Sequence, residues 1–307
     1  MGLFSRERQE KFFLNQREVI IIDRIYPGKD IKTINFIEGI KQEIVLYCSS
    51  ALDAKLFPSI TFILEETKKE VAWINTPEII GGKAVIYLSP LFMLEKSNGR
   101  TNLIRPNLSS TIQHELNHIW DEQETGMLSL YSQVEQKTNK LLAESPISTD
   151  FSNVRKDLLN FFWKLRLEGL PTYLKHRKTL FFTKEAFEQS YGQAEIEVKV
   201  VHNRWASFLV YAHDQRNSKN SASLLAKKMR DCYYTVAPHL LYTIIFAEKG
   251  NLTFKEIIRM RTFAFIKLYE SCARKLGYSP LVSATSGDGI LDYKRMVVEW
   301  WVVAKPK

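Results

Sequence analysis

Cysteine is scarce in this chain, which has three in 307 residues. Cys48, Cys232 and Cys272 lie far apart, are odd in number and form no Cys-x-x-Cys pattern. A disulfide framework needs paired cysteines, and a thiolate metal site needs closely spaced ones. The sequence indicates neither, and we expect three buried, reduced thiols.

Long hydrophobic runs are also missing. The longest apolar stretch, residues 233–247, contains Pro238 and His239 and is shorter than the roughly 20 residues that span a bilayer. The first ten residues carry charges where a secretory signal has an apolar centre, and Arg6 stands where a myristoylation signal has Ser or Thr. We expect a cytoplasmic protein without a membrane span.

Acidic residues are outnumbered by basic ones, 34 against 43, which gives a formal net charge of +9. The dense basic clusters are residues 175–178 and 227–230. Neither alternates with aromatic residues as a single-strand nucleic-acid groove does, and no nucleic-acid-binding signature is present. We therefore expect solvated basic faces and no nucleic-acid partner.

One stretch, residues 113–120, reads Gln-His-Glu-Leu-Asn-His-Ile-Trp. On a helix, His114 and His118 share one face, so both imidazoles can bind one Zn²⁺ at about 2.0–2.1 Å. Glu115 is placed to take a proton from a zinc-bound water, whose pKa the metal lowers to about 7. The stretch predicts a catalytic site with one zinc ion per chain.

The flanking residues favour a helix here. Residues 110–113, Ser-Thr-Ile-Gln, have the form of a capping box, so we expect the helix to begin near Ser110. An apolar stripe on a face other than that of the two histidines is predicted to pack against the core. Its members are Leu108, Ile112, Leu116, Ile119 and Trp120.

A catalytic zinc usually has three protein ligands, so a third must come from elsewhere. One candidate is Glu124, six residues after the second histidine, but that arrangement needs a glycine at position 121, where this chain has Asp121. The other is Glu168, at the end of a later predicted helix, where Gly169 and Pro171 indicate a break.

These two motifs resemble those of the gluzincin zinc metallopeptidases, the group of thermolysin and the minigluzincins. The His-Glu-x-x-His motif matches their first motif, and the segment Glu168–Tyr173 looks like their glutamate-helix motif. The order of elements is similar over roughly residues 30 to 175.

The resemblance implies zinc ligands His114, His118 and Glu168, with Glu115 as general base for the hydrolysis of a peptide or protein substrate. Thermolysin-like members often have a carboxylate where this chain has Thr172, and it orients a zinc-bound histidine. Asp121 is a candidate for that role.

The tetrahedral intermediate of such a reaction needs a hydrogen-bond donor for its oxyanion. Tyr173 is the first candidate because it closely follows Glu168, and His239, a lone histidine in an apolar run, is the second. His202 and Tyr234 are weaker candidates. For each of them the alternative is an ordinary buried side chain with satisfied hydrogen bonds.

The predicted fold class is α+β: a zincin-like small β-sheet with an active-site helix and a glutamate helix, then a mostly α-helical C-terminal part. The corresponding domains are residues 1–175 and 176–307, the second completing the cleft. The last predicted strand, 83–88, is a candidate sheet edge for binding an extended peptide. Strands are expected at 18–25, 59–64, 71–75 and 83–88, and helices at 30–48, 127–142, 154–168, 184–213, 221–232, 235–248 and 253–276.

The tail, 296–303, is predicted to be a docked strand or helix. Two other functions stay open: a zincin-fold protein that binds metal or regulates without turnover, and a basic scaffold protein in which the motif is accidental.

Overall fold

The computed structural model describes residues 8–14, 17–25, 31–50, 56–66, 71–96, 104–145, 147–169, 183–212, 214, 218–248, 252–285 and 288–304. The chain divides into two compact units, Met1–Gly126 and Met127–Lys307. The predicted domain boundary at residue 175 lies outside the described residues. The observed division comes earlier, so the helix that leads to Glu168 belongs to the second unit.

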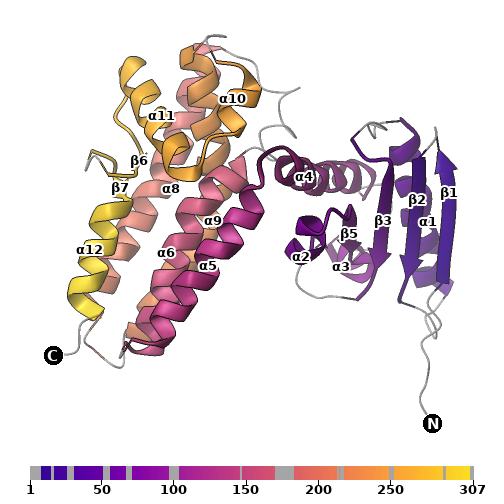
Figure 1. Ribbon diagram of the computed structural model, residues 1–307, viewed down its shortest axis with the longest axis horizontal. Helices are drawn as coiled ribbons and strands as arrows, with labels where there is room; N and C mark the ends of the chain where they lie inside the picture. Colours follow the sequence, from indigo (N-terminus) through magenta and orange to yellow (C-terminus); the bar gives the residue numbers. More distant parts are fainter. Residues whose placement is uncertain are drawn as a thin grey trace. The chain divides into compact units, whose positions relative to one another are not determined.

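The first unit contains a five-stranded mixed sheet in the order β1-β2-β3-β5-β4 (Figure 1). Its strands are β1 (Arg8–Leu14), β2 (Arg17–Asp23), β3 (Ser59–Leu64), β4 (Ala72–Trp73) and β5 (Val85–Leu88). The strands β2, β3 and β5 run parallel, and β1 and β4 pair antiparallel with their neighbours. The four predicted strands are confirmed, while β1 was missed because its charged first half, Arg-Gln-Glu-Lys, carries no strand signal.

The expectation that residues 83–88 form a sheet edge is wrong. In the described part of the sheet, β5 lies between β3 and β4. Tyr87 and Leu88 pair with Trp73 and Ala72 of β4, and the Trp73 and Tyr87 rings stack with centroids 5.3 Å apart. The four residues of β5 are all buried, which is typical of an inner strand.

Two long helices complete the first unit, α1 (Ile31–Ser50) and α4 (Ile104–Thr125), with short α2 (Thr76–Ile80) and α3 (Pro90–Lys96). The predicted helix at 30–48 is confirmed as α1, which packs against β1, β2, α3 and α4. Ile37, Ile40 and Ile44 are buried, whereas Ile31 and Leu46, also part of its apolar pattern, are exposed.

Helix α4 begins at Ile104, not near Ser110 as predicted. The proline at position 106 falls in its first turn, where a backbone N–H has no partner within the helix, so a proline is tolerated there. The predicted apolar stripe is confirmed: Leu108, Ile112, Leu116 and Ile119 are all at most 2% exposed, and Trp120 is half-buried.

The second unit is mostly helical, with α9 packed against α8, α6 and α11. Its elements are α5 (Met127–Ala143), α6 (Thr149–Leu167), α8 (Lys184–Tyr211), α9 (Ser218–Glu248), α10 (Phe254–Ile258), α11 (Thr262–Lys275), β6 (Val282–Ser283), β7 (Leu291–Asp292) and α12 (Tyr293–Ala304). The tail is a helix, α12, which packs against α6, α8 and β7.

Two predicted boundaries in this unit are wrong. Helices expected at 221–232 and 235–248 are one helix, α9, which continues through Pro238. Its residues 236–244 are largely buried against neighbouring helices, and this packing outweighs the cost of an interior proline. The single helix expected at 253–276 is divided into α10 and α11.

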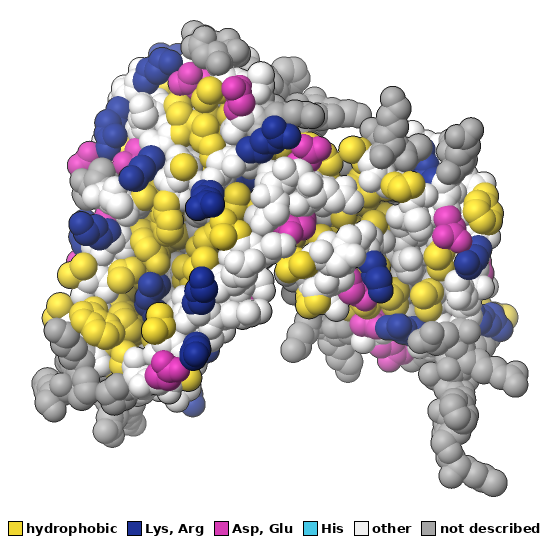
Figure 2. All heavy atoms as spheres, in the orientation of Figure 1, with side chains coloured by type: hydrophobic (Ala, Val, Ile, Leu, Met, Phe, Trp, Pro, Cys, Tyr) yellow, Lys and Arg dark blue, Asp and Glu magenta, His cyan; other side chains and the backbone are white. Residues whose placement is uncertain are grey.

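The fold class is therefore α+β, mostly helical with a small mixed sheet, as expected. Among the described helices, none is both long and apolar enough to span a lipid bilayer. Figure 2 shows that Lys and Arg side chains are dispersed among apolar ones on this face of the Met127–Lys307 unit, without a continuous basic stripe.

Candidate metal centre

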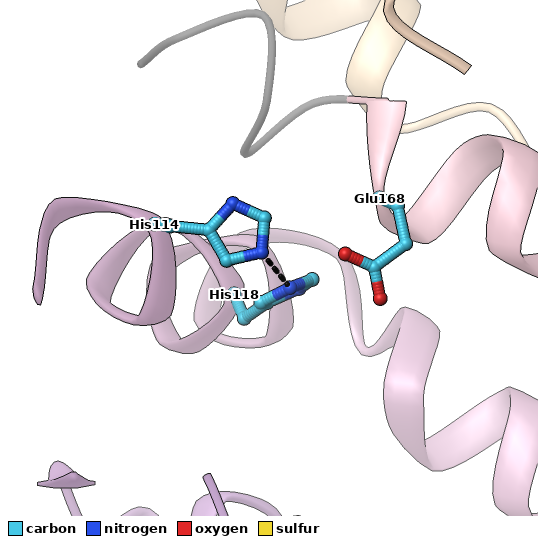
Figure 3. A group of neighbouring side chains, drawn as sticks. All are labelled: His114, His118 and Glu168. Carbon is cyan, nitrogen blue, oxygen red and sulfur yellow. Dashed lines mark hydrogen bonds between the residues drawn. The ribbon is translucent and has the colours of Figure 1, made fainter. Parts of the chain in front are cut away.

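The two histidines of the His-Glu-x-x-His motif converge on helix α4. The Nε2 atoms of His114 and His118 lie 3.2 Å apart, and their rings are nearly perpendicular (Figure 3). Two nitrogen ligands of one tetrahedral zinc, each about 2.0–2.1 Å from the metal, lie about 3.3–3.4 Å apart. The pair therefore has the separation of two ligands that share one metal ion.

Helix α4 is held in place by packing and by a polar network that the sequence analysis did not identify. Tyr47 on α1 donates a hydrogen bond to Gln113 Oε1 (2.6 Å), and Gln113 Nε2 donates to Asn117 Oδ1 (3.0 Å). Gln113 and Asn117 each precede one of the two histidines and are four residues apart, a spacing at which side chains meet on a helix. That spacing was the available signal for their pairing, whereas Tyr47 is distant in sequence.

The carboxylates on α4 occupy different environments. Glu115 is 8% exposed. Asp121 is 1% exposed, and its Oδ1 accepts a hydrogen bond from the Thr125 hydroxyl at 3.2 Å. Asp121 is three residues after His118, so its side chain lies on the same side of the helix. Its predicted role in orienting a histidine stays a prediction.

Glu168 follows the last residue of α6 as its C-cap, which confirms the predicted helix end. Its side chain is buried, and Oε1 accepts a hydrogen bond from Lys164 Nζ at 2.7 Å. The i, i+4 spacing on α6 allows this pair because such side chains are neighbours on a helix surface. Lys164 neutralises the carboxylate and orients it.

His114 and His118 lie in the Met1–Gly126 unit and Glu168 lies in the Met127–Lys307 unit, and these three side chains offer two imidazole nitrogens and one carboxylate as possible metal ligands. Two imidazole nitrogens and one carboxylate are a donor set of catalytic zinc sites. Glu124 is not one of these three residues. Helix α4 continues to Thr125 without a break at Asp121, so Glu124 stays on the helix, turned away from the histidine face.

Gly169, next to Glu168, is required by a close backbone approach. A Cβ atom at this position would lie 2.8 Å from the Ala237 carbonyl oxygen of α9. Because backbone atoms cannot move aside cheaply, the contact excludes a side chain. The Glu-Gly pair in the sequence therefore reflects packing of the α6 end against α9.

The first two of the four oxyanion-donor candidates, Tyr173 and His239, have different outcomes. Tyr173 lies outside the described residues. His239 lies on α9, is 1% exposed and is not one of the three possible metal ligands. Its Nδ1 lies 3.0 Å from the Ser190 hydroxyl and its Nε2 lies 3.2 Å from the Thr243 hydroxyl, so both ring nitrogens have partners.

Burial lowers the pKa of the His239 imidazole to about 3. The rings of Phe187, Tyr191 and Tyr269 surround it, with centroids 5.4, 5.7 and 6.3 Å away, and none of these groups carries charge near neutral pH. His239 is therefore neutral in the folded protein.

This neutral histidine should make stability depend on pH. The unfolded chain binds a proton at His239 below about pH 6.5, and the folded chain does not, so the stabilisation is complete above that pH and is lost as the pH falls toward 3. We expect His239 alone to reduce the free energy of unfolding by about 2 kcal/mol between pH 7.5 and 5. Urea unfolding across this range, for wild type and His239→Gln, measures the difference, and parallel pH curves for the two proteins would contradict it.

No protein-family model matches the chain, and no solved structure matches it. The chain is similar to a probable DNA-directed RNA polymerase of Neurospora crassa, with 35% identity over 117 residues. The matched part is 33% of this chain and only 12% of the length of that relative.

Proposed function

We propose that the protein is a zinc-dependent metallopeptidase. The observation that carries this proposal is the 3.2 Å separation of the His114 and His118 Nε2 atoms within a His-Glu-x-x-His motif. Glu168, buried and oriented by Lys164, is the proposed third ligand. The small sheet with a histidine helix, followed by a helix ending in glutamate, supports a gluzincin-like arrangement.

Each side chain has a defined task in this proposal. Zinc bound by the two imidazoles and the Glu168 carboxylate supplies a Lewis acid for the peptide carbonyl and lowers the pKa of water to about 7. Glu115 accepts a proton from the attacking water and delivers it to the leaving amine. Tyr173 remains the first candidate donor to the oxyanion. The two hydrogen bonds of His239 leave it a weaker one.

The test is the zinc content of the purified 307-residue chain, measured by mass spectrometry. We expect about one zinc per chain in wild type, because three protein ligands and one open position make a catalytic site. Glu168→Ala should lose the metal or bind it much more weakly, since only the two histidines remain.

Glu124→Ala is the matched control, because it removes a carboxylate from the histidine helix but not from the proposed ligand set. It should retain the zinc. Wild-type protein that binds no zinc after dialysis against a zinc solution would refute the proposal. Loss of zinc in Glu124→Ala but not in Glu168→Ala would show that Glu168 is not the third ligand. Zinc binding without cleavage of a peptide library would favour a catalytically silent metal-binding protein.

A second candidate function is a basic scaffold that binds nucleic acid. Two observations favour it: the formal net charge of +9, and the partial similarity to a protein described as a probable DNA-directed RNA polymerase. Such binding weakens steeply with salt, because it depends on counterion release. Salt-sensitive DNA binding by a protein that takes up no zinc would establish this function instead.

A further inference from the structure

A pocket lies in the helical unit, between α5, α6 and α9. Its volume is about 240 Å³, enough for one large side chain. The lining residues are Tyr131, Asp157, Asn160, Phe161, Lys164, Ala226, Met229, Arg230 and Tyr233. All of them belong to the described part of the Met127–Lys307 unit, so the pocket is built by this unit alone.

The pocket follows the face of α6 that ends at Glu168. Asp157, Phe161, Lys164 and Glu168 recur at intervals of four, three and four residues, so they lie on one side of the helix. With a rise of 1.5 Å per residue, the lining residues lie about 6 to 16 Å along the axis from Glu168. An extended peptide advances about 3.3 Å per residue. The distance along α6 from Glu168 to the pocket therefore corresponds to about two to five residues of an extended peptide.

The chemistry of the pocket is set by Asp157. Its carboxyl is half-buried, and no side chain in the described part of the chain forms a salt bridge with it. Burial raises the pKa of Asp157, and the charge of Arg230 opposes that shift only in part. A cationic partner stabilises a half-buried carboxylate more than an exposed one, because burial has already removed part of the water that solvates it.

The other groups favour a long side chain with a cationic end. Phe161 and Met229 are buried and provide an apolar floor for an aliphatic stem. Tyr131 and Tyr233 also line the pocket, and the face of an aromatic ring attracts a cation. The two cations of the pocket do not favour an acidic occupant, because Lys164 already contacts Glu168 and Arg230 is exposed to water.

We propose that this pocket binds a lysine or arginine side chain of a peptide, with the ammonium or guanidinium on Asp157 and the stem on Phe161 and Met229. Its use as a specificity pocket for cleavage rests on the proposed metallopeptidase function. Its ability to bind a basic side chain does not, because no proposed zinc ligand lines it.

The experiment uses the metal-free 307-residue chain with ¹³C-labelled methionine methyl groups, since Met229 lines the pocket and its methyl group reports on binding there. Blocked arginine, norleucine and glutamate (Nα-acetyl, C-terminal methylamide) are titrated separately. We expect blocked arginine to shift the Met229 signal at lower concentration than the other two probes. Asp157→Asn should weaken its binding about 10-fold or more, because it removes a charge-assisted hydrogen bond.

The matched control is Asp231→Asn, which removes the same charge from an exposed position on α9 outside the pocket and should leave arginine binding unchanged. Equal binding of arginine and norleucine, or preference for glutamate, would overturn the inference. Both comparisons are made on the wild-type protein, so neither depends on the folding of a variant. Arginine binding to a protein that takes up no zinc would uphold the pocket and refute the metallopeptidase. Zinc-dependent cleavage with no arginine binding would do the reverse.

Discussion

Replacing Glu115 by glutamine is expected to slow peptide hydrolysis by about 10²- to 10⁴-fold while one zinc ion per chain stays bound. Glutamine has nearly the same shape as glutamate but cannot accept a proton from water. The metal ligands are unchanged, because Glu115 is not one of the three possible metal ligands. Hydrolysis rates for wild type and variant, with zinc content measured on the same samples, test this expectation.

Glu122→Gln is the matched control for that variant. Glu122 lies on the same helix, is buried to a similar degree (9% against 8% exposed) and is outside the His-Glu-x-x-His motif. We expect its rate to remain close to that of wild type. A Glu115→Gln variant that hydrolyses peptide as fast as wild type would show that Glu115 is not the general base.

Replacing Lys41 by methionine is expected to destabilise the Met1–Gly126 unit by about 3–5 kcal/mol. The Lys41 ammonium lies 2.8 Å from Glu10, 3.0 Å from Glu38 and 3.3 Å from Asp23. The side chains of Lys41 and Asp23 are only 4% and 3% exposed. Methionine fills the space of the lysine stem but leaves the Asp23 carboxylate buried without its cation.

The pKa of Lys41 is raised: burial lowers it, but hydrogen bonds to Glu10 and Glu38 and the charge of Asp23 together outweigh that effect. A raised pKa means that the stabilisation is complete below about pH 10.5 and is lost only as the pH rises past that value. The destabilisation by Lys41→Met should therefore be fully visible at pH 7. Amide hydrogen exchange in peptides from β2 and α1, measured by mass spectrometry, reports the opening of this unit.

Lys11→Met is the control for Lys41→Met, since it also removes one positive charge. Lys11 pairs with Glu18 at 3.1 Å, but the two side chains are 52% and 30% exposed. An exposed pair of this kind contributes at most about 1 kcal/mol. Equal effects of the two substitutions would contradict the special role of the buried pair.

Local periodicity predicted much of what surrounds the candidate site. The spacing of His114 and His118 and the apolar stripe of α4 depend only on the helical repeat. The end of α6 at Glu168 was predicted from a glycine and a proline, which act on their own neighbours. The start of α4 was predicted too late. Residues 110–113 match a capping box, but they lie inside a helix that already begins at Ile104.

Local sequence patterns did not predict the contacts between segments that are distant in the chain. β5 was taken for an edge because its pairing with the two-residue strand β4 has almost no sequence signal. α9 was predicted as two helices separated at residues 233–234, whereas packing against three helices makes it one helix that continues through Pro238. The buried pair of Asp23 and Lys41 joins a strand to a helix and has no local spacing rule.

The sequence by itself determined the chemistry that is available: a histidine pair one turn apart, a glutamate between them, and a second glutamate at a helix end. These features depend on residue type and short-range spacing, which the backbone geometry of a helix converts directly into position. Only the tertiary structure decided the surroundings: the Tyr47 anchor of α4, the pocket at Asp157 and the enclosure of His239. Burial and charge pairing arise when distant segments pack, and they set which of these groups are neutral, charged or held for reaction.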